Sequence, residues 1–276
     1  MSSPPPTTQP PPPHRLVLSA AEFAYLVAKT GMEMPPGWRP APDTPFGLAE
    51  SELTKKRVVQ GTGEEAEVHR SVQVNLGILA GPQVMLDTTV SIAGKGSRSL
   101  HAVSGPLGAS LFVLADGAVE LSMFAAVHLG RELIRAVPPD STTTGISSAL
   151  SESAPDPLRG TVPLTALHEM GVARLMREAD PGVQAAVLDK LDLPAAEAKV
   201  ALRAANRSDG ALRCQLTGKA GGRVASEQIT WLHSDAGWSG ITPVPDGSGR
   251  KLVKLEPAAR EDIGTWVAPF VAATLS

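Results

Sequence analysis

One order of helices and strands occurs twice along this chain, and it limits the folds that the chain can adopt. The first run starts with a short apolar strand over 16–18 and a helix, passes through two helical segments to four strands, and closes with a helix. The second run repeats strand, helices, four strands and helix over 161–276. A shared order of this length favours a duplicated unit over a chance alternation of helices and strands.

Local signals place the elements of the first run. Ser19 and Glu22 have the spacing of a capping box, and Gly31 is suited to end the helix that follows. From Gln83 onward apolar residues occupy alternate positions, which is typical of half-buried strands. We expect helices over 48–60 and 64–79, strands over 83–92, 97–103, 108–115 and 118–124, tight turns at AGKGS and at Asp116-Gly117, and a closing helix over 125–137.

The second run begins with TVPLTALHEMGVARLM, in which Thr165 takes the place of Ser19 as the expected cap. Pro257 is suited to the first turn of the closing helix. We expect helices over 181–191, 194–206 and 257–275, and strands over 211–218, 223–232, 238–244 and 250–256.

The repeat predicts an α+β fold with pseudo-twofold symmetry. Two four-stranded meanders, each with its own first strand, would pair edge to edge into one central antiparallel sheet flanked by helical bundles, which protects the open strand edges. The expected organisation is a disordered proline-rich tail over 1–14, a first half over 15–137, a Ser/Thr/Pro-rich linker over 138–160 and a second half over 161–276, with both halves in one domain.

Composition excludes several classes of partner. The net charge of −3 gives no positive field for nucleic acid, and an aromatic content of 4% gives few stacking platforms. The most apolar stretch, 107–129, is interrupted by Asp116 and Glu120, so we expect no membrane insertion. A lone Cys214 excludes an internal disulfide and is consistent with the cytoplasm.

No complete motif for catalysis, a cofactor or a metal occurs in the chain. His168-Glu169 starts like a zinc-binding helix, but Val172 stands where the second histidine is needed. Gly94-Lys95 lacks the earlier glycine of a phosphate loop. We therefore expect no catalytic residue, no cofactor and no metal, and we expect Cys214 to be a buried, inert thiol.

The segment ITWLHSDAGWSGITPVP contains both an imidazole and a carboxylate. We expect His233 to Gly237 to be a turn, with Asp235 bonded to the backbone and the tryptophans Trp231 and Trp238 packed on the sheet. The alternative is a hydrolase in which Ser239, His233 and Asp235 converge only in three dimensions.

Three stretches resemble one family. They are LVLSAAEFAYL near the start, RVASEQITWLHSDAGWSGITPV, and LVKLEPAAREDIGTWVAPFV at the end. Together with the order of elements, they make the chain similar to the EspG family, the cytosolic chaperones of ESX (type VII) secretion. The proline-rich tail and the Ser/Thr-rich linker have no place in that pattern.

The resemblance implies a non-enzymatic protein that holds PE/PPE-type helical export substrates soluble in the cytosol, and a smaller WXG100-like substrate stays open. It implies that the partner is bound by the loop between the first two meander strands and by the second helical bundle. The candidate partner-binding residues are therefore Ala93, Gly94, Lys95, Gly96, Ser97, Arg98, Val183, Val187 and Leu191, with Lys95 and Arg98 as polar contacts.

Two alternatives remain open for this surface. AGKGSR has the composition of an ordinary solvated hairpin turn, with no partner bound there. The whole protein could also be a scaffold whose partner is a second copy of itself, in which case a homodimer would form without any substrate.

Overall fold

The computed structural model describes residues 15–41, 44–139, 156–220, 222–247 and 249–275. The predicted tail over 1–14 and most of the predicted linker lie outside these ranges. Among the described residues, no helix is both long and apolar enough to span a membrane.

A large antiparallel sheet organises the chain. Its strands are β1 (Arg15–Leu18), β4 (Val84–Ile92), β5 (Lys95–Ser104), β6 (Leu107–Val113), β7 (Val119–Ala125), β8 (Gly160–Pro163), β9 (Ser208–Ala220), β10 (Arg223–Ser234), β11 (Gly237–Val244) and β12 (Leu252–Ala258). They pair in the order β1-β7-β6-β5-β4-β9-β10-β11-β12-β8. The predicted α+β class with a central antiparallel sheet is confirmed, while the duplication itself stays a prediction.

Helices and a small hairpin complete the fold. The helices are α1 (Ala20–Thr30), α2 (Ala49–Lys55), α3 (Arg70–Ala80), α4 (Leu129–Ala136), α5 (Leu164–Met176), α6 (Val183–Leu191), α7 (Ala195–Arg207) and α8 (Ile263–Leu275), and the hairpin pairs β2 (Val59–Gln60) with β3 (Glu67–Val68). The described residues divide into two compact units, one drawn from the ranges 15–83 and 101–129 and the other from the ranges 84–100 and 130–275.

The capping box of α1 is present as predicted. The Ser19 hydroxyl accepts from the Glu22 N–H at 3.2 Å, and the Glu22 carboxylate accepts from the Ser19 N–H at 2.6 Å. Gly31 ends the helix with a φ of 63°. Lys56 also binds the Glu22 carboxylate, at 2.7 Å, so the first turn of α1 is tied to the end of α2.

Two predicted helices of the first unit are too long. The helix over 48–60 ends at Lys55, because Arg57 has a φ of 58° and turns the chain toward β2. The helix over 64–79 begins only at Arg70, with His69 as its N-cap. The hairpin β2–β3 lies between these two helices. Its two-residue strands are too short to show an alternation of apolar residues in the sequence.

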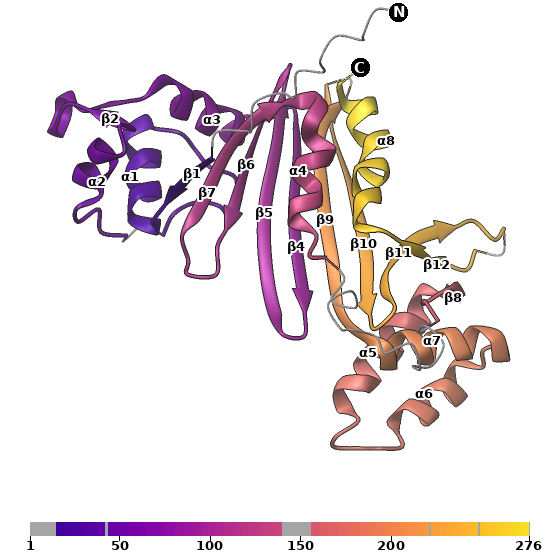
Figure 1. Ribbon diagram of the computed structural model, residues 1–276. Helices are drawn as coiled ribbons and strands as arrows, with labels where there is room; N and C mark the ends of the chain where they lie inside the picture. Colours follow the sequence, from indigo (N-terminus) through magenta and orange to yellow (C-terminus); the bar gives the residue numbers. More distant parts are fainter. Residues whose placement is uncertain (1–14, 42–43, 140–155, 221, 248, 276) are drawn as a thin grey trace, which may run out of the picture. The chain divides into compact units, whose positions relative to one another are not determined.

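In the second unit, α8 covers one face of the sheet. It packs on β9, β10 and β4, and Figure 1 shows it beside β10. The Trp266 ring of α8 lies 5.6 Å from that of Trp231, which in turn lies 6.3 Å from Trp238. Trp231 and Trp238 are both buried, which confirms their predicted role in sheet packing. The predicted start of this helix at Pro257 is wrong, because Pro257 belongs to β12.

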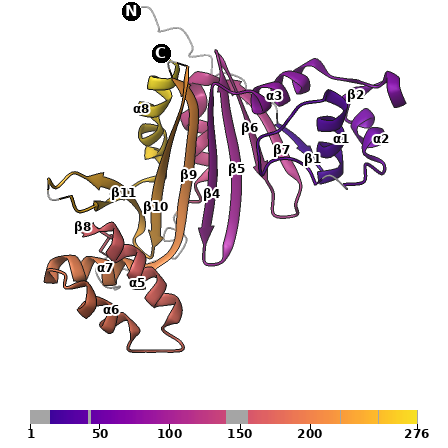
Figure 2. The ribbon, with the colours of Figure 1, turned by 180° about the vertical axis from the view of Figure 1, so that it is seen from behind.

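The second unit also contains a three-helix bundle of α5, α6 and α7. Its buried cluster includes Ala166 and Met170 of α5, Ala201 and Ala204 of α7, and Leu255 of β12. Thr165 does not cap α5, since Pro163 holds the N-cap position without a side-chain bond. Viewed from behind, in Figure 2, α5 and α7 lie near one end of β9 and β10.

Candidate partner-binding surface

The turn between β4 and β5 is tighter than the sequence suggested. Ala93 and Gly94 both have positive φ values, 48° and 77°, which is the pattern of a type I′ turn. Lys95 therefore already begins β5, and the five-residue turn AGKGS is wrong. The side chain of Lys95 is exposed, as are Gly96 and Ser97.

Arg98 is engaged within the protein. Its guanidinium donates two bonds to the Asp87 carboxylate, from Nε to Oδ1 at 3.2 Å and from Nη2 to Oδ2 at 2.7 Å. Such a two-pronged pair fixes the arginine in one geometry. Of the two predicted polar contacts, Lys95 is therefore exposed and Arg98 is held by the neighbouring strand.

A junction between α7 and β9 joins this turn to the helical bundle. The Ala93 N–H donates to the Asp209 carbonyl at 2.8 Å. The carboxylate of Asp209 contacts His233 Nδ1 at 2.6 Å, and Arg174 of α5 donates to the Ser208 carbonyl. The two regions predicted to bind the partner are thus neighbours, brought together by residues that follow α7 directly.

A groove opens beside this junction, between α5 and the sheet. Its volume is about 560 Å³. We call it the α5 groove, and its lining residues are Leu164, Leu167, His168, Gly171, Arg174, Leu175, Ala204, Ala205, Ser208, Arg213, Gln228, Thr230, Leu232 and Ile241. It is thus built from α5, the end of α7 and the face of β9, β10 and β11.

Helix α5 carries two apolar stripes. One stripe, Ala166, Met170 and Ala173, is buried in the bundle. The other follows the groove, where Leu164 is 42% exposed and Leu175 is 83% exposed. Large apolar side chains that stay accessible along one helix face are typical of a surface that a partner covers.

The charge in the groove has one sign. Arg174 and Arg213 line it, and none of its lining residues is a carboxylate. Arg174 donates a hydrogen bond to the Ser208 carbonyl, whereas Arg213 is exposed on β9. The groove therefore combines an apolar floor with a positive rim, which suits a partner with acidic residues beside apolar ones.

The predicted residues of α6 do not line the groove. Val183, Val187 and Leu191 are all half-buried. Val187 and Leu191 pack against the buried cluster of the bundle. Their apolar spacing therefore holds α6 onto the bundle, and any effect on a partner would come through the position of α6.

The residues of α5 and β9 that line the groove are not among those predicted from the sequence. A signal was present, because Leu164 and Leu175 lie outside the stripe formed by Ala166, Met170 and Ala173. A helix with apolar residues on a second stripe has more apolar surface than one contact face needs. The place of Arg213 in the groove could not be predicted, since β9 and α5 lie side by side only in the tertiary structure.

Ser239, His233 and Asp235, the residues of the alternative hydrolase site, do not form hydrogen bonds with one another in the described structure. Ser239 Oγ is buried and has no hydrogen-bond partner among the described residues. His233 contacts Asp209, and Asp235 accepts from the Arg207 guanidinium at 2.6 Å. The predicted backbone-bonding role of Asp235 is also wrong, because Ser234 Oγ accepts the Ala236 N–H of this turn instead, at 3.3 Å.

His233 also lies outside the turn in which it was expected. Strand β10 continues to Ser234 and β11 begins at Gly237, so the turn consists of Asp235 and Ala236 alone. Within the described ranges, no three His, Cys, Asp or Glu side chains gather as a metal site would require.

Cys214 is fully buried on β9, where the Thr88 hydroxyl donates to its sulfur at 3.3 Å. Burial raises the pKa of this thiol to about 11, so the reactive thiolate is disfavoured at neutral pH. This burial agrees with the predicted position of Cys214 on the apolar face of its strand.

Comparison with known proteins decides the family. The model of the EspG family matches residues 19–268, which is most of the chain. The chain belongs to the EspG family. No curated protein matches it.

Among solved structures, this EspG-family chain is similar to the Mycobacterium tuberculosis type VII secretion system chaperone EspG5, solved in complex with a PE25–PPE41 dimer. The two are 12% identical with a TM-score of 0.61, over 95% of this chain and 96% of the other. At that identity the likeness shows a shared fold. HtdX of the same organism, with 11% identity over 88% of this chain and 98% of its own, has a TM-score of only 0.15, which supports no shared fold.

Proposed function

We propose that this EspG-family protein is a chaperone of type VII secretion that binds PE/PPE-type helical export substrates in the cytosol and keeps them soluble before export. It acts without catalysis, by covering apolar surface of the substrate. The observation that carries the proposal is the α5 groove, in which exposed leucines lie beside unopposed positive charge. The family and the shared fold with a substrate-bound chaperone support it.

The substrate would dock with the tip of a helical hairpin in the α5 groove. Leu164 and Leu175 would cover apolar side chains of that tip, while Arg213 would pair with a carboxylate at its flank. The β4–β5 turn at Ala93 and Gly94, together with the start of β5 up to Arg98, would contact the same partner from the other side of the α7–β9 junction. Lys95 supplies its exposed polar contact, and Arg98 holds the strand in position through Asp87.

Affinity capture tests this function. The tagged chain, expressed where the secretion system is active, should co-purify with one small helical export substrate, which mass spectrometry would name as PE/PPE-type or as WXG100-like. L175D places a charge on a side chain that is 83% exposed and should abolish capture without unfolding the protein. V224D is the matched control, because Val224 is 72% exposed and lies outside the groove.

Two outcomes would contradict the proposal. One is recovery of no helical partner under any condition in which the secretion system is expressed. The other is stable self-association of the purified chain with no substrate, measured by light scattering, which would favour the homo-oligomeric scaffold, including a homodimer.

A further inference from the structure

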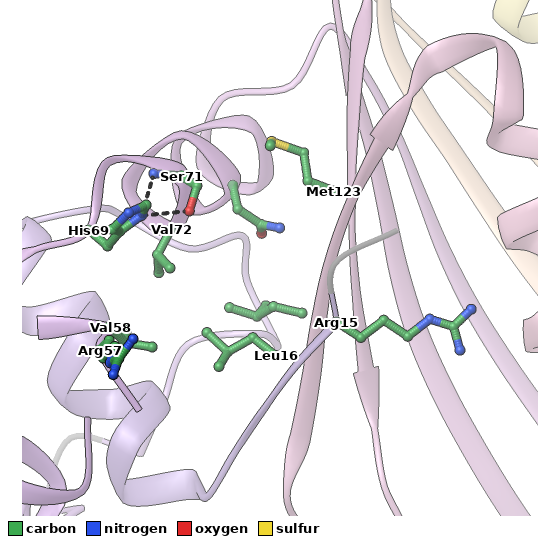
Figure 3. Close-up of a pocket in the computed structure, with 10 residues that line it drawn as sticks. Arg15, Leu16, Arg57, Val58, His69, Ser71, Val72 and Met123 are labelled. Carbon is green, nitrogen blue, oxygen red and sulfur yellow. Dashed lines mark hydrogen bonds between the residues drawn. The ribbon is translucent and has the colours of Figure 1, made fainter. Parts of the chain in front are cut away.

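A separate pocket of about 500 Å³ opens in the first compact unit. It lies between α3, the β1–β7 pair and the turn after α2, as Figure 3 shows. Its lining residues are Arg15, Leu16, Arg57, Val58, His69, Ser71, Val72, Asn75, Leu121 and Met123. The volume, and a lining that is half apolar and half polar, are those of a small-molecule site. No residue of the α5 groove lines it, so the inference is independent of the proposed function.

Asn75 gives the pocket a buried acceptor without a donor. The residue is 5% exposed, and its Nδ2 donates to the Ser122 carbonyl at 2.9 Å. That bond fixes the orientation of the amide, since a carbonyl oxygen can only accept. Oδ1 is left with no hydrogen-bond partner in the described part of the chain. A buried acceptor in this state is unfavourable until a donor reaches it.

Arg57 gives the pocket a cation in a strained position. The Arg57 N–H donates to the Thr54 carbonyl at 3.0 Å and the Val58 N–H to the Leu53 carbonyl at 2.9 Å, which closes α2 as a Schellman motif. Glycine usually occupies the left-handed position of this motif, but here Arg57 takes it with a φ of 58°. A residue held against its backbone preference beside a cavity points to a use for its side chain.

The other polar side chains are already oriented. His69 Nδ1 and Ser71 Oγ are 2.8 Å apart, and Figure 3 shows both at one side of the pocket. The side chain of Arg15 runs away from the other labelled residues in that view, toward an ion pair with Glu120 at 3.9 Å. Within the described residues no ion pair is formed by Arg57, so it is the cation available to a ligand.

We infer that this pocket binds a small amphipathic carboxylate with an N–H group in its body. The carboxylate would pair with Arg57, the N–H would donate to Asn75 Oδ1, and the apolar part would lie against Leu16 and Leu121. An N-acylated amino acid has all three groups. The last residue of a short peptide has the same chemistry.

Isothermal titration of the full chain with three matched probes tests this assignment. N-octanoylglycine should bind with one-to-one stoichiometry. Its methyl ester lacks the charge, and N-octanoylsarcosine lacks the N–H. Each of these two compounds should therefore bind at least about tenfold more weakly than N-octanoylglycine. A short peptide with a free apolar C-terminal residue is the fourth probe, and whichever of the peptide and N-octanoylglycine binds more tightly identifies the source of the ligand.

The variant R57G tests the cation without endangering the fold, because glycine adopts a positive φ freely. Its unfolding midpoint should not fall, while its affinity for N-octanoylglycine should drop about tenfold and its weak affinity for the ester should not change. R131A removes an equal charge from an exposed position of α4 and should bind like the parent protein.

Equal binding of the acid, the ester and the sarcosine derivative would overturn the assignment, as would no binding of any probe or an unchanged affinity of R57G. The two proposals fail separately. R57G should still capture the export substrate like the parent protein, so loss of probe binding says nothing against the chaperone, and loss of capture by L175D says nothing against the pocket.

Discussion

Gly210 of β9 lies opposite Ile92 of β4 with no room between them for a side chain. The two residues are register partners, and a β-carbon on Gly210 would lie 2.9 Å from the Ile92 Cα and nearer still to the Ser91 carbonyl. This close approach sets the end of β4 against the α7–β9 junction, where Ala93 bonds to Asp209. It therefore fixes the β4–β5 turn beside the α5 groove.

G210A should consequently destabilise the protein and weaken substrate binding together. Overpacking against backbone atoms costs about 1–3 kcal/mol, which urea unfolding would measure. G171A is the control for stability, because Gly171 lies in α5 with nothing within 4 Å of its β-carbon position. That variant should gain roughly 0.5–1 kcal/mol from the better helix former. A G210A protein as stable as the parent would contradict the close packing of Gly210 against β4.

Charge reversal at Arg213 should weaken substrate binding, chiefly by slowing association. Arg213 supplies positive charge to a groove that no carboxylate lines, and such charge steers an acidic partner. R213E should therefore bind the captured substrate about tenfold more weakly, with less sensitivity to salt. K219E reverses an exposed charge on the same strand outside the groove and should bind normally. Equal losses in the two variants would show that only net charge matters.

The acid stability of the protein should depend on Glu22. Burial raises the pKa of this carboxyl, but the hydrogen bonds from Lys56 and from the Ser19 N–H outweigh burial and hold the pKa below 4.5. The stabilisation is therefore present above the unfolded value of 4.5 and is lost as pH falls through the folded value.

E22Q should be less stable than the parent by about 1–2 kcal/mol at pH 7 and should lose less stability on acidification. Urea unfolding at pH 7 and at about pH 3 would measure both effects. E178Q, at an exposed position after α5, is the control. If E22Q and the parent lost the same stability between the two pH values, the pairing with Lys56 would not contribute.

Cys214 should resist modification in the folded protein. The thiol is buried and its pKa is about 11, so thiolate is scarce at pH 8. Reaction with a chromogenic disulfide reagent should be slow in buffer and rapid in denaturant. Fast reaction of the native chain would show that β9 opens readily from its neighbours.

Most of the fold that could be predicted from the sequence was predicted from the alternation of apolar residues along the strands. In β4 it places Val84, Leu86 and Val90 on the buried face, as expected, because each strand turns one side to the core. The capping box at Ser19 could also be predicted, because it involves only residues within the first turn of the helix. Two-residue strands and the turn at Arg57 could not be predicted, because they depend on positive φ at a residue that rarely adopts it.

The candidate binding surface was only partly predictable for a different reason. The spacing of Val187 and Leu191 shows an apolar stripe but not what covers it, and the structure covers it with the bundle itself. The α5 groove draws on α5, α7 and three strands, so no single segment contains its pattern. The role of Asp235 could not be predicted for the same reason, since its partner Arg207 lies on another element, α7.

Site-specific photo-crosslinking would show whether the substrate occupies the α5 groove. A photoreactive residue in place of Leu175, within the α5 groove, should crosslink the co-expressed PE/PPE-type substrate. The same residue in place of Val224, which is also exposed but lies outside the groove, should not. Crosslinking at 224 with none at 175 would show that the substrate binds elsewhere and would contradict docking in the α5 groove.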